Sequence, residues 1–473
     1  MGQTKHKVDK ESLLVSTKGK KNLVRAAQRT EIEIAKRGYK RKYIVSSVVE
    51  GSAISWDFIQ AMELYAKKNN AELVLLWMRG VYKQDHFDVE DLSKLRPYLA
   101  SEFRFNSKLF AKSFLIHPSQ KYPITGLQEY AQSNDSLICA STKQCLEVVP
   151  RPKGKVPHTI HTTGTVSIPN YSKTRTGCIA QQDNKLGALV IEIVDNSNFF
   201  IRQVQWIDHG FVDLGIKYTK SDATAVSCEA MVLGDLHLTE EDPKAIRATY
   251  AQFKHFKPKN IFLHDILSNN SINHHDTDKC VTKVKRVKSP YATLEKELDY
   301  GKRKLKEIKD NLPKDSHIYV VPSNHDDFIK TFCEDGHFVK DPLNAVMGAK
   351  CFICLVDNKN PLEVYLGMEG VTFLKKDSSL QIEGWECAEH GNLGSNGAKG
   401  SARSYMKSHG KAFIGHSHTP KIIGNIWQVG TLSKLSLPYT KGASSWMHAN
   451  GVIYEGGYTQ MIVFIGEKWN GNR

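Results

Sequence analysis

The pattern that decides the fold lies at residues 225–237, which read Ala225-Val-Ser-Cys-Glu-Ala-Met-Val-Leu-Gly-Asp-Leu-His237. Its apolar run predicts a buried β-strand, and the aspartate and histidine that follow lie where ligands gather at a sheet edge. Helical and strand patterns alternate after this segment, which is typical of an α/β domain. We expect helices near 242–254 and 291–312, and strands at 260–263, 317–321, 349–356, 371–374, 412–414 and 461–465.

Four further segments place polar side chains directly after apolar runs. They are His264-Asp265, Ser323-Asn324-His325-Asp326, Glu389-His390-Gly391 and Gly415-His416-Ser-His418. Because ligands in open α/β sheets collect outside the carboxyl ends of the strands, we expect these side chains to converge. Each segment alone has an ordinary explanation, since a chain with 19 histidines contains Asp-x-His by chance. The ordered set of five is much more specific than any of its members.

The residue types in this set suit a pair of divalent cations. Phosphate ester cleavage benefits from two ions about 3.5–4 Å apart, which activate a water and neutralise both oxygens of an in-line displacement. Aspartate, asparagine and histidine ligands without thiolates favour two catalytic ions, with manganese expected and magnesium, iron or zinc as alternatives. The sequence therefore predicts a two-metal phosphoesterase.

Residues 226–430 resemble the calcineurin-like metallophosphoesterase family, whose ordered pattern is Asp-x-His, Gly-Asp, Gly-Asn-His-Asp/Glu, a single His and Gly-His-x-His. The resemblance implies an α/β fold with a sandwich of two sheets flanked by helices. It implies one ion held by Asp235, His237 and His418, a second held by Asn324, His390 and His416, and Asp265 as the bridge. His325 would be the catalytic histidine that protonates the leaving oxygen, with Asp326 as a second catalytic candidate.

The chain departs from the family pattern at three positions. The family glycine before the bridging aspartate is His264 here, and the glycine before Asn-His is Ser323, so the local backbone is expected to differ. Many phosphatases of the family carry an acidic residue at the position of Ser268, where it orients the catalytic histidine. Either Asp326 or Asp327 orients His325 instead, or the pair is absent.

The first half of the chain has a different organisation. Residues 1–42 hold thirteen lysine or arginine and four acidic residues, a net charge of +9, and include a predicted helix at 18–37. This basic arm suits a polyanion, although a solubilising tail would have the same composition. A strand at 43–49, a helix at 56–68 and a strand at 71–78 predict a parallel βαβ unit. Short strands follow over 137–219, so we divide the chain into an arm (1–42), an α/β region of unknown role (43–225) and a catalytic domain (226–473).

Three features favour a nucleic acid as the substrate. The chain carries a formal net charge of +15, the basic arm precedes the first domain, and a basic segment at 279–288 follows Asp265. The candidate DNA contacts in that segment are Lys283, Lys285, Arg286 and Lys288. A solvated loop that leads into the next helix would explain the same charges equally well.

Within the family, the chain looks most like phage-encoded deoxyribonucleases that are related to the double-strand-break repair nucleases and degrade host DNA. The features that carry this resemblance are the α/β region before the catalytic domain, His264-Asp265-Ile and Asn273-His-His-Asp276. The repair nucleases have their capping region after the catalytic domain, so residues 1–225 have no counterpart there. A phosphatase or cyclic-nucleotide phosphodiesterase is the alternative, and the complete ligand set argues against a non-catalytic protein of the same fold.

Composition indicates a soluble protein of a reducing compartment. The nine cysteines are scattered and odd in number, which does not suit a disulfide framework, and Cys351-Phe-Ile-Cys354 reads as a pair of buried strand cysteines. No apolar run approaches the roughly 18–20 residues that span a bilayer, and the N-terminus lacks the apolar core of a secretory signal. We expect a cytoplasmic protein without membrane contact, and the sequence leaves a homo-oligomer open.

Overall fold

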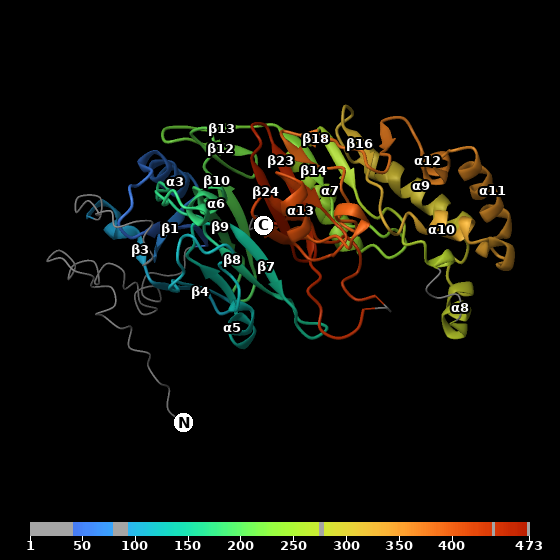
Figure 1. The fold of residues 1–473 in the computed structure, drawn as a ribbon, viewed down its shortest axis with the longest axis horizontal. Coiled ribbons are helices and arrows are strands. Elements are labelled where there is room, and N and C mark those ends of the chain that lie inside the picture. The colour runs from blue at the N-terminus through green and yellow to red at the C-terminus, as the bar shows by residue number, and fades with distance from the viewer. Residues whose placement is uncertain (1–40, 79–92, 274–278, 438–439, 471–473) are drawn as a thin grey trace, which may run out of the picture. The chain divides into compact units, whose positions relative to one another are not determined.

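The computed structural model describes residues 41–78, 93–273, 279–437 and 440–470 (Figure 1). The chain divides into two compact units, of which unit 1 comprises Met1–Val149, His158–Ala225 and Asn470–Arg473, and unit 2 comprises Pro150–Pro157 and Val226–Trp469. The division after Ala225 falls where the sequence places a domain boundary. The expected helix at 18–37 lies outside the described residues. Both units combine helices with sheets, which confirms the predicted α/β class.

Unit 1 begins with the βαβ unit that the sequence predicts. Strands β1 (Lys42–Val49) and β2 (Ala71–Met78) pair in parallel, and α3 (Trp56–Lys68) connects them. Helix α3 buries Phe58, Met62 and Tyr65, whose spacing of three and four residues keeps them on one face. The sheet has the order β10-β9-β1-β2-β3, with β3 at Leu99–Ala100, β9 at Gly187–Ile193 and β10 at Phe199–Gln205.

The other strands of unit 1 are short, as the sequence indicates. One set runs in the order β7-β8-β6-β5-β4, and another in the order β11-β12-β13. Their bounds are β4 Glu102–Asn106, β5 Leu109–Lys112, β6 Ser136–Cys139, β7 Cys145–Val149, β8 His158–Thr162, β11 Phe211–Asp213, β12 Ile216–Tyr218 and β13 Ala223–Ala225. The helical segments are η2 (Arg96–Tyr98), α5 (Leu127–Ser133) and α6 (Arg175–Asp183).

Unit 2 contains a sheet with the order β17-β16-β15-β14-β23-β24. The four strands from β14 to β17 are parallel, and β23 pairs antiparallel with β14 and β24. Their bounds are β14 Cys228–Val232, β15 Asn260–Leu263, β16 His317–Val320, β17 Val371–Phe373, β23 His448–Tyr454 and β24 Thr459–Phe464. The parallel arrangement brings the carboxyl ends of β14, β15 and β16 to one edge, as the sequence predicts.

Further strands of unit 2 run in the order β18-β19-β20-β22-β21. Strands β19, β20 and β22 are parallel to one another, so their carboxyl ends also share one edge. The bounds are β18 Gln381–Ile382, β19 Trp385–Glu386, β20 Ala412–Ile414, β21 Lys421–Ile423 and β22 Ile426–Gln428.

The helices of unit 2 lie between β14 and β18 in the sequence, except for the last two, which lie between β19 and β20. They are α7 (Pro243–Phe256), η3 (Asn270–Ile272), α8 (Cys280–Val287), α9 (Leu294–Asp310), α10 (Phe328–Glu334), η5 (His337–Lys340), α11 (Ala345–Val356), α12 (Pro361–Leu366), η6 (Ser395–Gly397) and α13 (Ala402–Ser408). Figure 1 shows α9, α10, α11 and α12 grouped together. None of the helices in the described parts of the chain has both the length and the apolar character that crossing a bilayer requires.

Two predictions about this helical region are wrong. The strand predicted at 349–356 belongs to helix α11, whose buried residues Met347, Gly348 and Cys351 follow helical spacing. A continuous apolar run carries no periodicity that separates a strand from a helix, which explains the error. The basic segment before the long helix, expected as a loop, contains helix α8, while residues 274–278 lie outside the described residues.

Candidate metal centre

All seven predicted metal ligands follow the carboxyl ends of strands in unit 2. Backbone hydrogen bonds join the loops that carry them. The Leu236 amide donates to His264 O (3.0 Å), and the His237 amide donates to Asp265 O (2.8 Å). In the second set of strands, the Gly415 amide donates to His390 O (2.7 Å). The loops are therefore held together by their backbones as well as by the side chains that they present.

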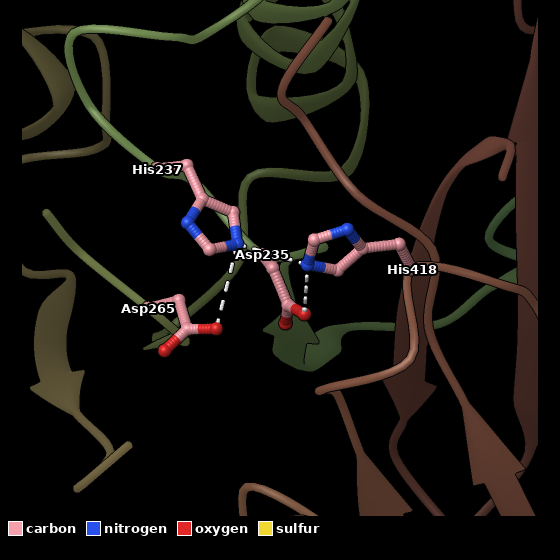
Figure 2. Close-up of side chains that lie close together, drawn as sticks. All are labelled: Asp235, His237, Asp265 and His418. Atoms are coloured by element: carbon pink, nitrogen blue, oxygen red, sulfur yellow. Dashed lines mark hydrogen bonds and ion pairs between the residues drawn. The ribbon is translucent and has the colours of Figure 1, made fainter. Parts of the chain in front are cut away.

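Four buried side chains form a first cluster, with one ligand atom of each within 4.8 Å of the others (Figure 2). They are Asp235, His237, Asp265 and His418. His237 Nε2 lies 2.8 Å from His418 Nε2 and 3.4 Å from Asp265 Oδ2. His418 Nε2 lies 3.2 Å from Asp235 Oδ2.

A second cluster surrounds the amide oxygen of Asn324. Asn324 Oδ1 lies 3.0 Å from His390 Nε2 and 2.9 Å from His416 Nδ1. His390 Nε2 is also 3.3 Å from Asp265 Oδ2, the same oxygen that faces His237 in the first cluster. One oxygen of Asp265 therefore lies between the two ligand sets. Asn324 and His416 are half-buried, so this cluster is the more accessible of the two.

The spacing and chemistry of these atoms fit cations. Ligands about 2.1 Å from one ion are about 3.0–3.4 Å apart in octahedral or tetrahedral geometry, close to most of the separations described above. Neither carboxylate oxygen of Asp235 accepts a hydrogen bond of normal geometry among the described residues, although the side chain is wholly buried. Because a buried carboxylate without hydrogen bonds is costly, the position of these oxygens beside the imidazole of His418 favours a bound cation.

The backbone is strained at four of the seven ligands. His237 (φ 46°), Asp265 (φ 44°), His416 (φ 74°) and His418 (φ 59°) all have left-handed conformations that non-glycine residues rarely adopt. Such conformations cost of order 1–3 kcal/mol each and cluster at functional sites. The backbone at Gly415 lies close to the Asp235 carboxylate, because a Cβ at this position would be 2.3 Å from Asp235 Oδ1.

The charges of the two clusters depend on one another. Burial raises the pKa of Asp265, but the charge of His390 and its hydrogen bond to the carboxylate outweigh it and hold this pKa well below its usual range. Burial lowers the pKa of His390, but the charge and hydrogen bond of Asp265 outweigh it and raise this pKa to about 9. In the metal-free protein a protonated His390 therefore supplies positive charge that a cation would otherwise supply.

Two other histidines of the clusters are held neutral. Burial is the first cause in both cases. It lowers the pKa of His237 to about 3, and it lowers the pKa of His416 with a further contribution from the charge of His390. A neutral imidazole has the free nitrogen lone pair that metal coordination requires.

The predicted catalytic residues have different surroundings. His325 Nδ1 lies 3.3 Å from Ser268 O, so a backbone carbonyl of the residue that replaces the family's acidic position orients the imidazole. The Asp326 carboxylate instead accepts bonds from Ser323 Oγ (2.7 Å) and from the Ile266 and Leu267 amides, while burial and the charge of Asp265 raise its pKa to about 7. Through these hydrogen bonds, Asp326 stabilises the loop that carries Asp265.

Asp327, the other acidic residue proposed to orient His325, forms an ion pair with Lys376 (3.3 Å). Its described contacts therefore give the imidazole no carboxylate partner. The serine at position 323 is explained by its bond to Asp326, which a glycine could not make.

A polar pocket of about 180 Å³ opens beside His390. Lys376, Glu389, Asn392 and Tyr405 line it together with other residues, and Tyr405 Oη donates to Glu389 Oε2 (2.9 Å). Sequence reasoning did not single out Lys376, Asn392 or Tyr405, because they belong to no motif and their places depend on how distant loops fold together.

The four candidate DNA contacts lie on or directly after helix α8. Lys285 and Lys288 are exposed, whereas Arg286 forms an ion pair with Asp341 (3.0 Å) that occupies its guanidinium. Lys283 belongs to α8, but its side chain lies outside the described part of the structure. Arg286 is therefore the weakest of the four candidates.

Comparisons with known proteins give one informative result. No family model matches the chain, and no solved structure matches it. The chain is 27% identical to "Protein A1" of Escherichia phage T5 over 467 residues, an alignment that covers 91% of this chain and 83% of the relative. Along most of its length the chain is thus similar to a protein of a bacterial virus.

Proposed function

We propose that this protein is a two-metal phosphodiesterase that hydrolyses DNA, with manganese as the expected metal. The observation that carries the proposal is the position of Asp265 Oδ2, which lies 3.4 Å from His237 Nε2 and 3.3 Å from His390 Nε2. A carboxylate shared by two ligand sets suits a pair of ions that activate a water and stabilise both oxygens at the reacting phosphorus. The arrangement fits the calcineurin-like metallophosphoesterase pattern that the sequence resembles.

The accessible side of the centre is the second cluster. Asn324 and His416 are half-buried there, and the polar pocket opens beside His390. We infer that the phosphodiester approaches from this side, and that His325 assists departure of the leaving oxygen.

DNA is favoured over a small phosphodiester by the positive charge of the chain. The net charge of +15 and the exposed Lys285 and Lys288 would bind a phosphate backbone. Degradation of host DNA during phage infection is the role that we propose, and it would take place in the host cytoplasm. A phosphatase or small-molecule phosphodiesterase would use the same ions without needing the positive charge. A homo-oligomer stays a prediction.

The test compares substrates in the presence of manganese. The full chain is incubated with supercoiled plasmid, linear duplex, single strands and bis-p-nitrophenyl phosphate. We expect cleavage of DNA and of the chromogenic diester. Asp265→Asn should lower both activities by more than about 10²-fold and remove both ions, because the bridging charge is lost. Asp208→Asn makes the same chemical change at a side chain that is 80% exposed and should leave activity unchanged. Hydrolysis of bis-p-nitrophenyl phosphate without cleavage of DNA would favour the small-molecule phosphodiesterase alternative instead.

A further inference from the structure

His264 is a buried histidine at a position where the resembled family has glycine. It follows β15 directly, is wholly buried, and its carbonyl accepts the Leu236 amide bond (3.0 Å). Its ring packs over Gly415, where an added Cβ would lie 3.2 Å from His264 Cγ. The imidazole thus occupies space inside the centre without belonging to either ligand cluster.

The ring of His264 contacts one ligand of the second ion. His264 Nδ1 lies 3.3 Å from His390 Nδ1, and the two rings are 5.4 Å apart at an interplanar angle of 31°. The other nitrogen of His390, Nε2, faces Asn324 Oδ1 (3.0 Å) and Asp265 Oδ2 (3.3 Å). The two ring nitrogens of His390 therefore face different partners.

This arrangement determines where the hydrogen of His390 must lie. A neutral imidazole that gives the Nε2 lone pair to a metal carries its hydrogen on Nδ1. His390 is buried, so that hydrogen needs an acceptor, since an unmade bond of a buried donor costs about 1–3 kcal/mol. Nδ1 of His264 is in the position to accept it, and His264 then carries its own hydrogen on Nε2, which has no hydrogen-bond partner among the described residues.

We propose that His264 is a positioning residue for the second ion, which keeps Nε2 of His390 directed at the metal by accepting a hydrogen bond from its Nδ1. The inference rests on the proposed two-metal function. Metal-binding histidines usually donate their second N–H to a carboxylate, a backbone carbonyl or water. A neutral imidazole performs this task without adding a third negative charge beside Asp235 and Asp265.

Two substitutions separate this role from simple packing. His264→Asn keeps an acceptor, because the amide oxygen can stand near the position of Nδ1. His264→Leu fills a similar volume without an acceptor. Manganese binding to the full chain is titrated by following the electron paramagnetic resonance signal of free Mn²⁺. We expect His264→Leu to weaken the second ion by about 10–100-fold, with the first ion unchanged, and His264→Asn to stay within about threefold of the wild type.

Two further variants keep the test decisive. In His264→Gly, which restores the family residue, added free imidazole should recover binding of the second ion, so a failure of the leucine variant to fold leaves the proposal testable. His161→Leu is the matched control, because His161 is also buried and its Nδ1 lies 3.1 Å from Gln203 Nε2 in unit 1. It should leave both ions unaffected.

The proposal is overturned when His264→Leu and His264→Asn bind both ions like the wild type, or when both weaken the second ion equally. Lack of rescue by imidazole in a folded His264→Gly protein would also contradict it. Failure of the wild type to bind two manganese ions would instead reject the proposed function itself, so the two failures are distinguishable.

Discussion

The side chain and the backbone amide of His325 make separate hydrogen bonds. The imidazole Nδ1 lies 3.3 Å from Ser268 O, whereas the backbone amide donates to Asp265 Oδ1 (3.2 Å). The backbone bond supports the bridging ligand whatever side chain stands at this position. Chemistry and metal binding are therefore separable at this residue.

We predict that His325→Ala lowers kcat on DNA by about 10²–10⁴-fold, because a proton donor for the leaving sugar oxygen is removed. Manganese affinity should stay within a few-fold, since the amide bond to Asp265 remains. Steady-state kinetics and metal titration on the same preparation check both parts. Loss of manganese together with activity would make His325 a structural residue, and unchanged kcat would remove it from the mechanism.

A second prediction at this scale concerns pH. The pKa of His390 is raised to about 9, so the metal-free protein holds a proton at neutral pH that coordination must displace. Calorimetric titration of manganese at pH 7, in buffers of different ionisation enthalpy, should show release of about one proton from this group, and the release should vanish above pH 9. Below pH 9 the apparent affinity should fall by about tenfold per pH unit.

The same shift has a consequence for stability. Because the folded pKa of His390 exceeds its value in the unfolded chain, the associated stability of the metal-free protein is fully present below about pH 6.5. It is lost as the pH rises through about 9. Thermal unfolding of the metal-free protein across this range checks the sign, and a melting temperature that rises between pH 7 and 9 would contradict it.

Helices and strands were predictable where the apolar residues have a clear spacing or clear limits. They were not predictable where the apolar run is continuous. The strand before Asp235 and the helix α9 were expected close to their observed bounds, because apolar residues with clear limits or helical spacing specify them. Helix α11 was mistaken for a strand, since its apolar run carries no periodicity and tertiary packing decides its conformation. Its exposed face includes Val346 (72%) and Ile353 (59%), which an interpretation of the run as buried could not anticipate.

The candidate metal centre was likewise predictable only in part. The convergence of the seven predicted ligands was predictable because each follows the end of a strand, and parallel strands bring their carboxyl ends together. The acceptor for His325 could not be identified, because Ser268 contributes its backbone carbonyl, which every residue has. The pocket beside His390 could not be predicted either, because the residues that line it come from loops that are brought together only by the fold of unit 2.

At the scale of the whole molecule, charge is unevenly distributed along the chain. Residues 1–42 carry a net charge of +9 out of a total of +15. We predict that deleting residues 1–40 weakens duplex binding and makes the affinity less dependent on salt. The slope should fall by about 0.9 for each phosphate that the shortened chain no longer neutralises. Cleavage of bis-p-nitrophenyl phosphate should hardly change, because the predicted metal ligands all belong to unit 2.

Binding isotherms at several salt concentrations measure this slope for the full and shortened chains. An unchanged slope with intact cleavage would show that the arm does not contact DNA. A change in oligomer size at every salt concentration would instead assign the arm to contacts between subunits.

The sheet that carries Asp235 can form only after a late part of the chain has been synthesised. Strand β14 lies between β15 and β23, and the amide of Gly234 donates to Asn450 Oδ1, 216 residues further along the chain. Gly430 and Thr431 hold Asp235 itself through its backbone. A ribosome must therefore finish nearly all of unit 2 before the first cluster can close. Chains that stop short of Asn450 would therefore lack the assembled first cluster, and under the proposed function they would be inactive.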